Sequence, residues 1–143
     1  MVKPNLLNHE FYEILDLSVG NYKGKHSIII KLAPVIYKTM CNLLNSIALD
    51  QNHRNDLFVA IGYFVIPKDL YSESIFGPIG YIDDILLSIY VLRKIKEKYG
   101  IEEVYEYWDG DYNVLEKLLS SDFKKLKKEY LELFNSMLKF CGL

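Results

Sequence analysis

Residues 57–95 read LFVAIGYFVIPKDLYSESIFGPIGYIDDILLSIYVLRKI. Two strongly apolar segments stand at the ends of this stretch, and a segment rich in proline, glycine and acidic residues separates them. Each apolar segment is too short to span a bilayer but suits a buried helix. The stretch therefore predicts a helical hairpin, with one helix over Asp56–Ile66 that ends at Pro67 and another over Tyr81–Tyr99 that ends at Gly100.

Apolar residues continue at helical spacing before the hairpin. We expect a helix over Asn8–Ser18 with Asn8 as its N-cap, and a second helix that begins at Pro34 and carries an apolar stripe as far as Ile47. Residues 26–33 form a short β-branched run that fits either a strand or a helical turn. The polar segment Asp50–Asp56 is predicted to be a loop.

After the hairpin, the pattern predicts short helices over Ile101–Tyr107 and Val114–Ser120, the latter with Asn113 and Glu116 at capping-box spacing. A long helix over Asp122–Phe140 follows, because its apolar residues lie opposite a row of lysines. Together the elements predict an all-α protein, a single compact domain of six or seven helices over residues 1–143 with the apolar hairpin at its centre.

Composition limits the classes of function. The chain has 143 residues, of which 17 are Lys or Arg and 19 are Asp or Glu, so its formal net charge is −2. This balance gives no strong signal for a protein held on nucleic acid by counterion release. The two cysteines, Cys41 and Cys141, form no metal or disulfide framework, and the first residues lack the pattern of a signal peptide. We expect a reduced, cytoplasmic protein with buried thiols.

The hairpin carries an ordered set of unusual residues: Tyr63, Pro67, Asp69, Leu70, Gly80, Asp83 and Asp84. This set resembles the core motif of the YkvA-like family, small helical domains of uncharacterised function. The family pattern is roughly Tyr-x-x-x-Pro-x-Asp-Leu-Ile-Pro-Asp, then Pro-x-x-Gly-x-x-Asp-Asp, and the resemblance covers about residues 57–95. The chain departs from it in three ways: Ser72-Glu73 replaces the second Pro-Asp, the spacing to Gly80 is one residue longer, and Pro78 is one residue closer to Gly80.

The resemblance implies a helical hairpin with carboxylates clustered at its tip, namely those of Asp69, Glu73, Asp83 and Asp84. Three interpretations stay open for these four residues. In the one we favour, they accept hydrogen bonds from free backbone N–H groups of the tip and of the helix start. Alternatively they bind a hard cation, Mg²⁺, Mn²⁺ or Ca²⁺. In the third interpretation they form an acidic patch that contacts a partner.

Other candidate sites have weaker support. Asp109, Asp111 and Asn113 have the spacing that opens a calcium loop, but Val114 and Ser120 stand where glycine and glutamate are required. The three histidines, His9, His26 and His53, lack metal-ligand spacing. A lysine cluster at residues 124–128 is expected to be a solvated face. An aromatic group is expected to close the core or an interface: Tyr105, Tyr107, Trp108 and Tyr112.

The absence of a catalytic set from the sequence favours a non-enzymatic protein-interaction or regulatory module that binds another protein or itself. A divalent-metal-dependent hydrolase that uses the four carboxylates is the first alternative. The second alternative is a peripheral membrane or lipid-binding protein, with exposed apolar residues around Ile75–Phe76 and Ile79. Convergence of open carboxylates would favour the hydrolase, and buried, capped carboxylates would favour the interaction module.

Overall fold

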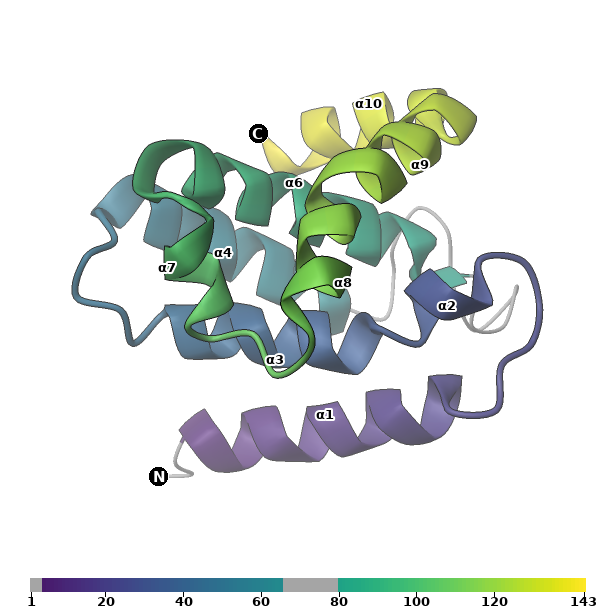
Figure 1. Ribbon diagram of the computed structural model, residues 1–143, viewed down its shortest axis with the longest axis horizontal. Coiled ribbons are helices and arrows are strands. Elements are labelled where there is room, and N and C mark those ends of the chain that lie inside the picture. The colour runs from purple at the N-terminus through teal and green to yellow at the C-terminus, as the bar shows by residue number, and fades with distance from the viewer. Residues whose placement is uncertain (1–3, 66–79) are drawn as a thin grey trace.

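The structure is a computed structural model that describes residues 4–65 and 80–143, with side chains from Phe11 onward. Helix α6 (Ile82–Tyr99) lies at its centre (Figure 1). Every residue from Ile82 to Ile89 is buried, so this part of α6 is enclosed on all sides. A helix buried all round must be covered by neighbours on each face. Helices α3, α4, α9 and α10 all pack against α6 and provide that cover.

The other helices form layers on either side of α6. Helix α1 (Pro4–Val19) packs against α3 (Ala33–Leu43), and α3 packs against both α4 (Gln51–Val65) and α6. Helices α9 (Phe123–Glu129) and α10 (Leu131–Cys141) lie on the opposite side of α6 from α1 (Figure 1). The described part of the chain contains no strand, so the predicted all-α fold is confirmed.

The predicted hairpin is present as the pair α4 and α6, which contact each other more extensively than any other two elements. Helix α6 has nearly the predicted bounds and ends at Gly100, whose φ of +92° suits a residue without a side chain. Residues 66–79, which join the two helices, lie outside the described residues. The central position of α6 agrees with its apolar sequence, because apolar side chains gain most from burial.

Three predictions for the first half of the chain need correction, and one open choice is resolved. Helix α1 begins at Pro4, so Asn8 lies within the helix and is not its N-cap. The predicted loop Asp50–Asp56 is wrong, because α4 begins at Gln51. The open choice at residues 26–33 resolves as helix, with the single turn α2 over Ser27–Ile30. The stripe expected to reach Ile47 ends earlier, since α3 ends at Leu43 and the side chain of Ile47 is 100% exposed.

The second half contains a short helix α7 (Ile101–Tyr105) and then α8 (Tyr112–Lys117). The N-cap of α8 is Asp111, which accepts a hydrogen bond from the N–H of Asn113 at 2.7 Å. The predicted cap at Asn113 was therefore two residues late. A π-helical turn over Leu118–Asp122 leads from α8 directly into α9.

The long helix predicted over Asp122–Phe140 is interrupted at Tyr130, whose φ and ψ are −115° and 36°. The interruption separates α9 from α10, and both helices pack against α6. His26 lies against this point: its ring packs edge-on to Tyr130, and its Nε2 is 2.6 Å from Oε2 of Glu129. That hydrogen bond lowers the pKa of Glu129 to about 2. The break in the helix therefore coincides with a contact from His26, which is distant in sequence. The local sequence pattern around Tyr130 does not reveal it.

Candidate functional site

The described part of the motif centres on Asp83 and Asp84 in the first turn of α6. Both side chains are fully buried. The hydroxyl of Tyr63, from α4, donates a hydrogen bond of 2.8 Å to Oδ2 of Asp83. The backbone N–H of Asp84 donates to Oδ1 of Asp83 at 3.0 Å. Each oxygen of the Asp83 carboxylate therefore has a donor, one from each helix of the hairpin.

Helix α10 lies beside this site. The ring of Phe140, in α10, packs edge-on against Tyr63 with 6.4 Å between centroids. Burial raises the pKa of the neighbouring Cys141 thiol, and the charge of Asp83 raises it further. A negative carboxylate disfavours a second negative charge nearby, so both causes raise the pKa of the thiol. Helix α10 thus brings Phe140 against the ring of Tyr63 and Cys141 close to Asp83.

The position of the acid pair also has a structural cause. The first turn of an α-helix has free N–H groups and the positive end of the helix dipole, and both favour carboxylates. The N-cap residue is Tyr81, and a short 3₁₀ turn of Gly80 and Tyr81 leads into α6. Asp83 therefore acts inside the first turn and not at the N-cap itself. The hydroxyl of Ser88 donates to the carbonyl oxygen of Asp84 at 2.7 Å and adds a bond within the same helix.

Four motif residues, Pro67, Asp69, Leu70 and Glu73, lie outside the described residues. The exposed apolar tip expected around Ile75–Phe76 and Ile79 lies outside them as well. Over residues 4–65 and 80–143, no group of three or more potential metal ligands converges. The four-carboxylate metal site therefore stays a prediction, of which the structure describes the two enclosed members. No helix in these ranges is both long and apolar enough to cross a membrane.

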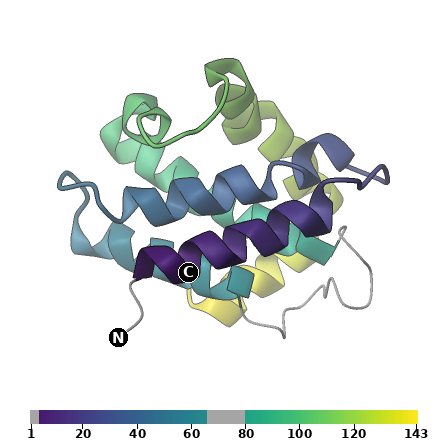
Figure 2. The ribbon, with the colours of Figure 1, turned by 90° about the horizontal axis from the view of Figure 1, so that it is seen from below.

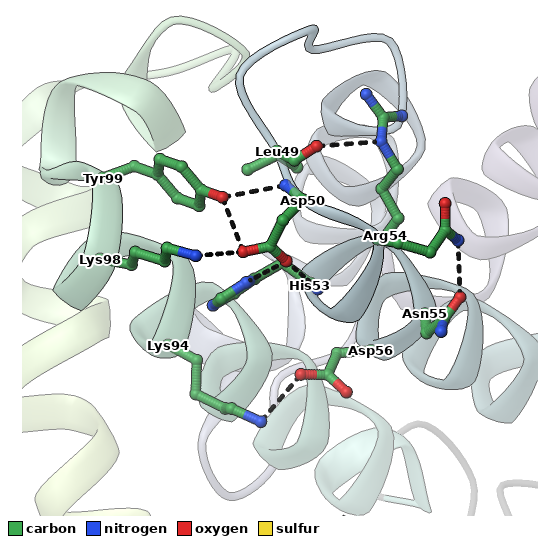
Figure 3. A network of polar contacts seen from close by, with 10 residues as sticks. Leu49, Asp50, His53, Arg54, Asn55, Asp56, Lys94, Lys98 and Tyr99 are labelled. Carbon is green, nitrogen blue, oxygen red and sulfur yellow. Dashed lines mark hydrogen bonds and ion pairs between the residues drawn. The ribbon is translucent and has the colours of Figure 1, made fainter.

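A second polar cluster, which the sequence analysis missed, lies where α4 begins and α6 ends (Figure 3). Asp50 is its centre and accepts hydrogen bonds from the ammonium of Lys98, the hydroxyl of Tyr99 and the N–H of His53. The ring Nδ1 of His53 lies 2.8 Å from the same carboxylate. Lys98 first, and then His53, hold the pKa of Asp50 far below its usual range. The cluster fixes the start of α4 to the last turn of α6.

Arg54 extends this cluster to the end of α3. Its guanidinium donates hydrogen bonds to the carbonyl oxygens of Leu44, Ser46 and Leu49. The last carbonyls of a helix and of the turn after it have no partners within the helix, and the planar guanidinium can reach several of them at once. Ser46 in turn is hydrogen-bonded to Glu103, from α7. These contacts explain why the polar segment before the hairpin is ordered as a helix. The sequence signal for them was the Asp50–His53 spacing of an N-cap.

The structure also shows where the other residues singled out from the sequence lie. Trp108 is buried, and its indole N–H donates to the carbonyl of Asp111 at 3.1 Å, so it closes the core as expected. Tyr105 and Tyr112 pack edge-on to each other near the surface. Cys41 is buried and free, and burial raises its pKa to about 11, while Cys141 is half-buried. The lysines at residues 124, 125, 127 and 128 are exposed.

The part of the chain that the structure describes is thus a small all-α fold in which a central hairpin encloses a pair of adjacent aspartates. A family described as "Protein of unknown function (DUF1232)" matches residues 57–90, from the middle of α4 to the middle of α6. This match confirms the resemblance that the motif predicted for the hairpin. The match includes the Tyr63 hydroxyl donor and both buried aspartates.

The chain is also similar to a protein of Methanothermobacter thermautotrophicus described as "Uncharacterized protein ORF9". The two are 28% identical over 130 residues, which are 91% of this chain and 88% of that protein. The similarity therefore extends well beyond the hairpin. No solved structure matches the chain significantly.

Proposed function

We propose that this protein is a non-enzymatic helical module that binds another protein or a second copy of itself. The observation that carries the proposal is the enclosure of Asp83 and Asp84, which are fully buried at the start of α6. A catalytic carboxylate has to reach a substrate or a water molecule. Both oxygens of Asp83 instead accept hydrogen bonds, one from Tyr63, which joins α4 to α6, and one from the N–H of Asp84 within α6. The motif acids then serve to hold the hairpin together.

Helix α1 offers the contact surface for a partner. It runs across the near side of the molecule in Figure 2, and α3 is its principal packing partner. Its outward side carries Ile14 and Leu17, whose side chains are 58% and 83% exposed. These residues lie three apart and so share a face of the helix. Exposed apolar side chains on one helix face are the usual anchors by which a helix docks against another protein.

Capture of binding partners on immobilised protein, compared between the parent and two variants, tests this proposal. Immobilised parent protein and the variant Ile14→Glu/Leu17→Glu are compared with Ile47→Glu, which changes an isolated, fully exposed residue. We expect the parent and the Ile47 variant to retain the same bound protein, identified by mass spectrometry, and the α1 double variant to lose it. Sedimentation of each purified variant shows whether that bound protein is a second copy of the chain.

Equal capture by all three baits, or none by the parent, would contradict the proposal for α1. Turnover of a phosphate ester by the parent with a divalent cation, lost in Asp84→Asn, would contradict the non-enzymatic assignment. Because both substitutions of the α1 double variant are on the surface, we expect it to fold like the parent. An unchanged circular dichroism spectrum is the check.

The hydrolase is the second candidate, and one observation favours it. Two adjacent buried carboxylates directly follow the segment 66–79, which contains Asp69 and Glu73. Carboxylate oxygens are the ligands that hard divalent cations prefer. In this candidate, Mg²⁺, Mn²⁺ or Ca²⁺ is held by these four acids. Membrane association and a cytoplasmic location stay predictions as well.

A further inference from the structure

A pocket of about 500 Å³ lies between the second half of α6 and α9. Four of its lining residues are cationic: Arg93, Lys94 and Lys96 from α6 and Lys127 from α9. One lining residue, Glu97, is acidic. The volume is within the usual range for small-ligand pockets, about 300–1,000 Å³. The pocket is separate from the acid pair, which lies at the other end of α6, and from the exposed side of α1.

Two of the cations have fixed positions. The guanidinium of Arg93 stacks on the ring of Phe123, 4.5 Å from its centroid, and donates to the carbonyl oxygen of Leu119. Phe123 is itself buried, so it is a rigid support. A guanidinium has five N–H groups. The bond to Leu119 therefore leaves Arg93 with further donors, and its side chain is already ordered.

Lys94 is held by an ion pair with Asp56, whose Oδ2 lies 2.8 Å from its Nζ. The other two cations are not neutralised in this way. Within the part of the chain that the structure describes, neither Lys96 nor Lys127 forms an ion pair. The Nζ of Lys127 lies 5.5 Å from the centroid of the Phe134 ring. When Asp56 and Glu97 are counted against the four cations, two positive charges are left over.

We propose that this pocket binds the phosphate group of a phosphorylated ligand. A phosphate monoester carries a charge of about −1.5 to −2 at neutral pH, which matches the surplus of the pocket. Arginine recognises phosphate through paired N–H groups, and lysine adds a point charge. The ordered guanidinium of Arg93 can orient the phosphate through its N–H groups, and Lys96 and Lys127, which form no ion pair, add positive charge. The phosphate group belongs either to a soluble compound or to a lipid headgroup.

Titration calorimetry with inorganic phosphate and pyrophosphate tests this proposal, at constant ionic strength with chloride as the reference. The test variant is Lys96→Gln/Lys127→Gln, which removes both lysines of the pocket that form no ion pair. The control is Lys124→Gln/Lys128→Gln, which removes the same charge from exposed positions of α9 outside the pocket. We expect the test variant to bind pyrophosphate at least about tenfold more weakly than the parent, and the control to change by about twofold or less.

Flotation of the protein with phosphatidylcholine vesicles that contain phosphatidic acid distinguishes a soluble phosphorylated ligand from a lipid headgroup. Binding of free pyrophosphate without flotation identifies a soluble ligand. Flotation that is lost in the test variant and kept in the control identifies a lipid headgroup. The proposal is overturned if the parent binds neither probe, or if the test and control variants lose binding equally, because the effect then reflects net charge alone. The result does not depend on whether α1 binds a protein partner.

Discussion

Replacement of Asp83 by alanine is expected to lower the free energy of unfolding by about 3 kcal/mol. The carboxylate is fully buried and accepts hydrogen bonds from the Tyr63 hydroxyl and the Asp84 N–H. Its removal leaves two buried donors without an acceptor, and each costs about 1–3 kcal/mol if it stays unsatisfied. A small cavity adds to the loss. Urea unfolding followed by circular dichroism measures the change.

A double-mutant cycle isolates the bond between the two helices. Tyr63→Phe removes the hydroxyl and keeps the ring, so the packing against Phe140 is preserved. We expect this variant to lose about 1–2 kcal/mol, and the Tyr63→Phe/Asp83→Ala pair to lose less than the sum of the two single variants. Strict additivity would show that the hydroxyl and the carboxylate do not interact, and would contradict the structural role of the motif.

Arg54→Met is expected to cost about 3 kcal/mol, a loss similar to that of Asp83→Ala. Methionine keeps the apolar length of the side chain but removes every donor to the carbonyl oxygens of Leu44, Ser46 and Leu49. Hydrogen bonds from a charged donor are worth about 1.5–3 kcal/mol each. Because water can replace part of these bonds at a half-buried site, the total falls well short of three full bonds. Thermal unfolding at neutral pH measures the loss.

Arg54→Lys is the matched control for that experiment. Lysine keeps the positive charge but lacks the planar fork that spans several carbonyl oxygens. If the planar geometry of the guanidinium is the cause, Arg54→Lys loses most of the stability that Arg54→Met loses. If Arg54→Lys is as stable as the parent, the positive charge alone is sufficient. The turn after α3 then does not depend on the planar shape of the guanidinium.

Local patterns in the sequence were enough to predict the helical hairpin. The all-α class and the bounds of α6 follow from a long apolar run between turn residues, with Gly100 as a clear stop. The early start of α4 was missed because polarity suggested a loop. Its helical state depends instead on Asp50 as a cap and on the contacts of Asp50 and Arg54 with distant segments. These contacts join residues far apart in sequence, which spacing rules do not reveal.

The candidate sites were predictable in part. The motif located Asp83 and Asp84, but the hydrogen bond from Tyr63 to Asp83 depends on how α4 packs against α6. The break at Tyr130 was not predictable, because tyrosine has no special backbone preference and the helical pattern continues through it. The cationic pocket was missed for a similar reason. Arg93, Lys94 and Lys96 resembled the usual basic end of a helix, and Lys127 resembled part of a solvated face. The packing of α9 against α6 brings them together.

The melting temperature of metal-stripped protein shows whether Asp83 and Asp84 are structural residues or metal ligands. It is measured with and without Mg²⁺, Mn²⁺ and Ca²⁺, for the parent and for Asp84→Asn. We predict no ion-specific shift in either protein, and a lower melting temperature for Asp84→Asn under every condition. A bound ion at about 100 times its dissociation constant would add roughly 2.7 kcal/mol, which corresponds to several degrees. Such a shift in the parent, absent from Asp84→Asn, would contradict the account and establish a metal site at the hairpin.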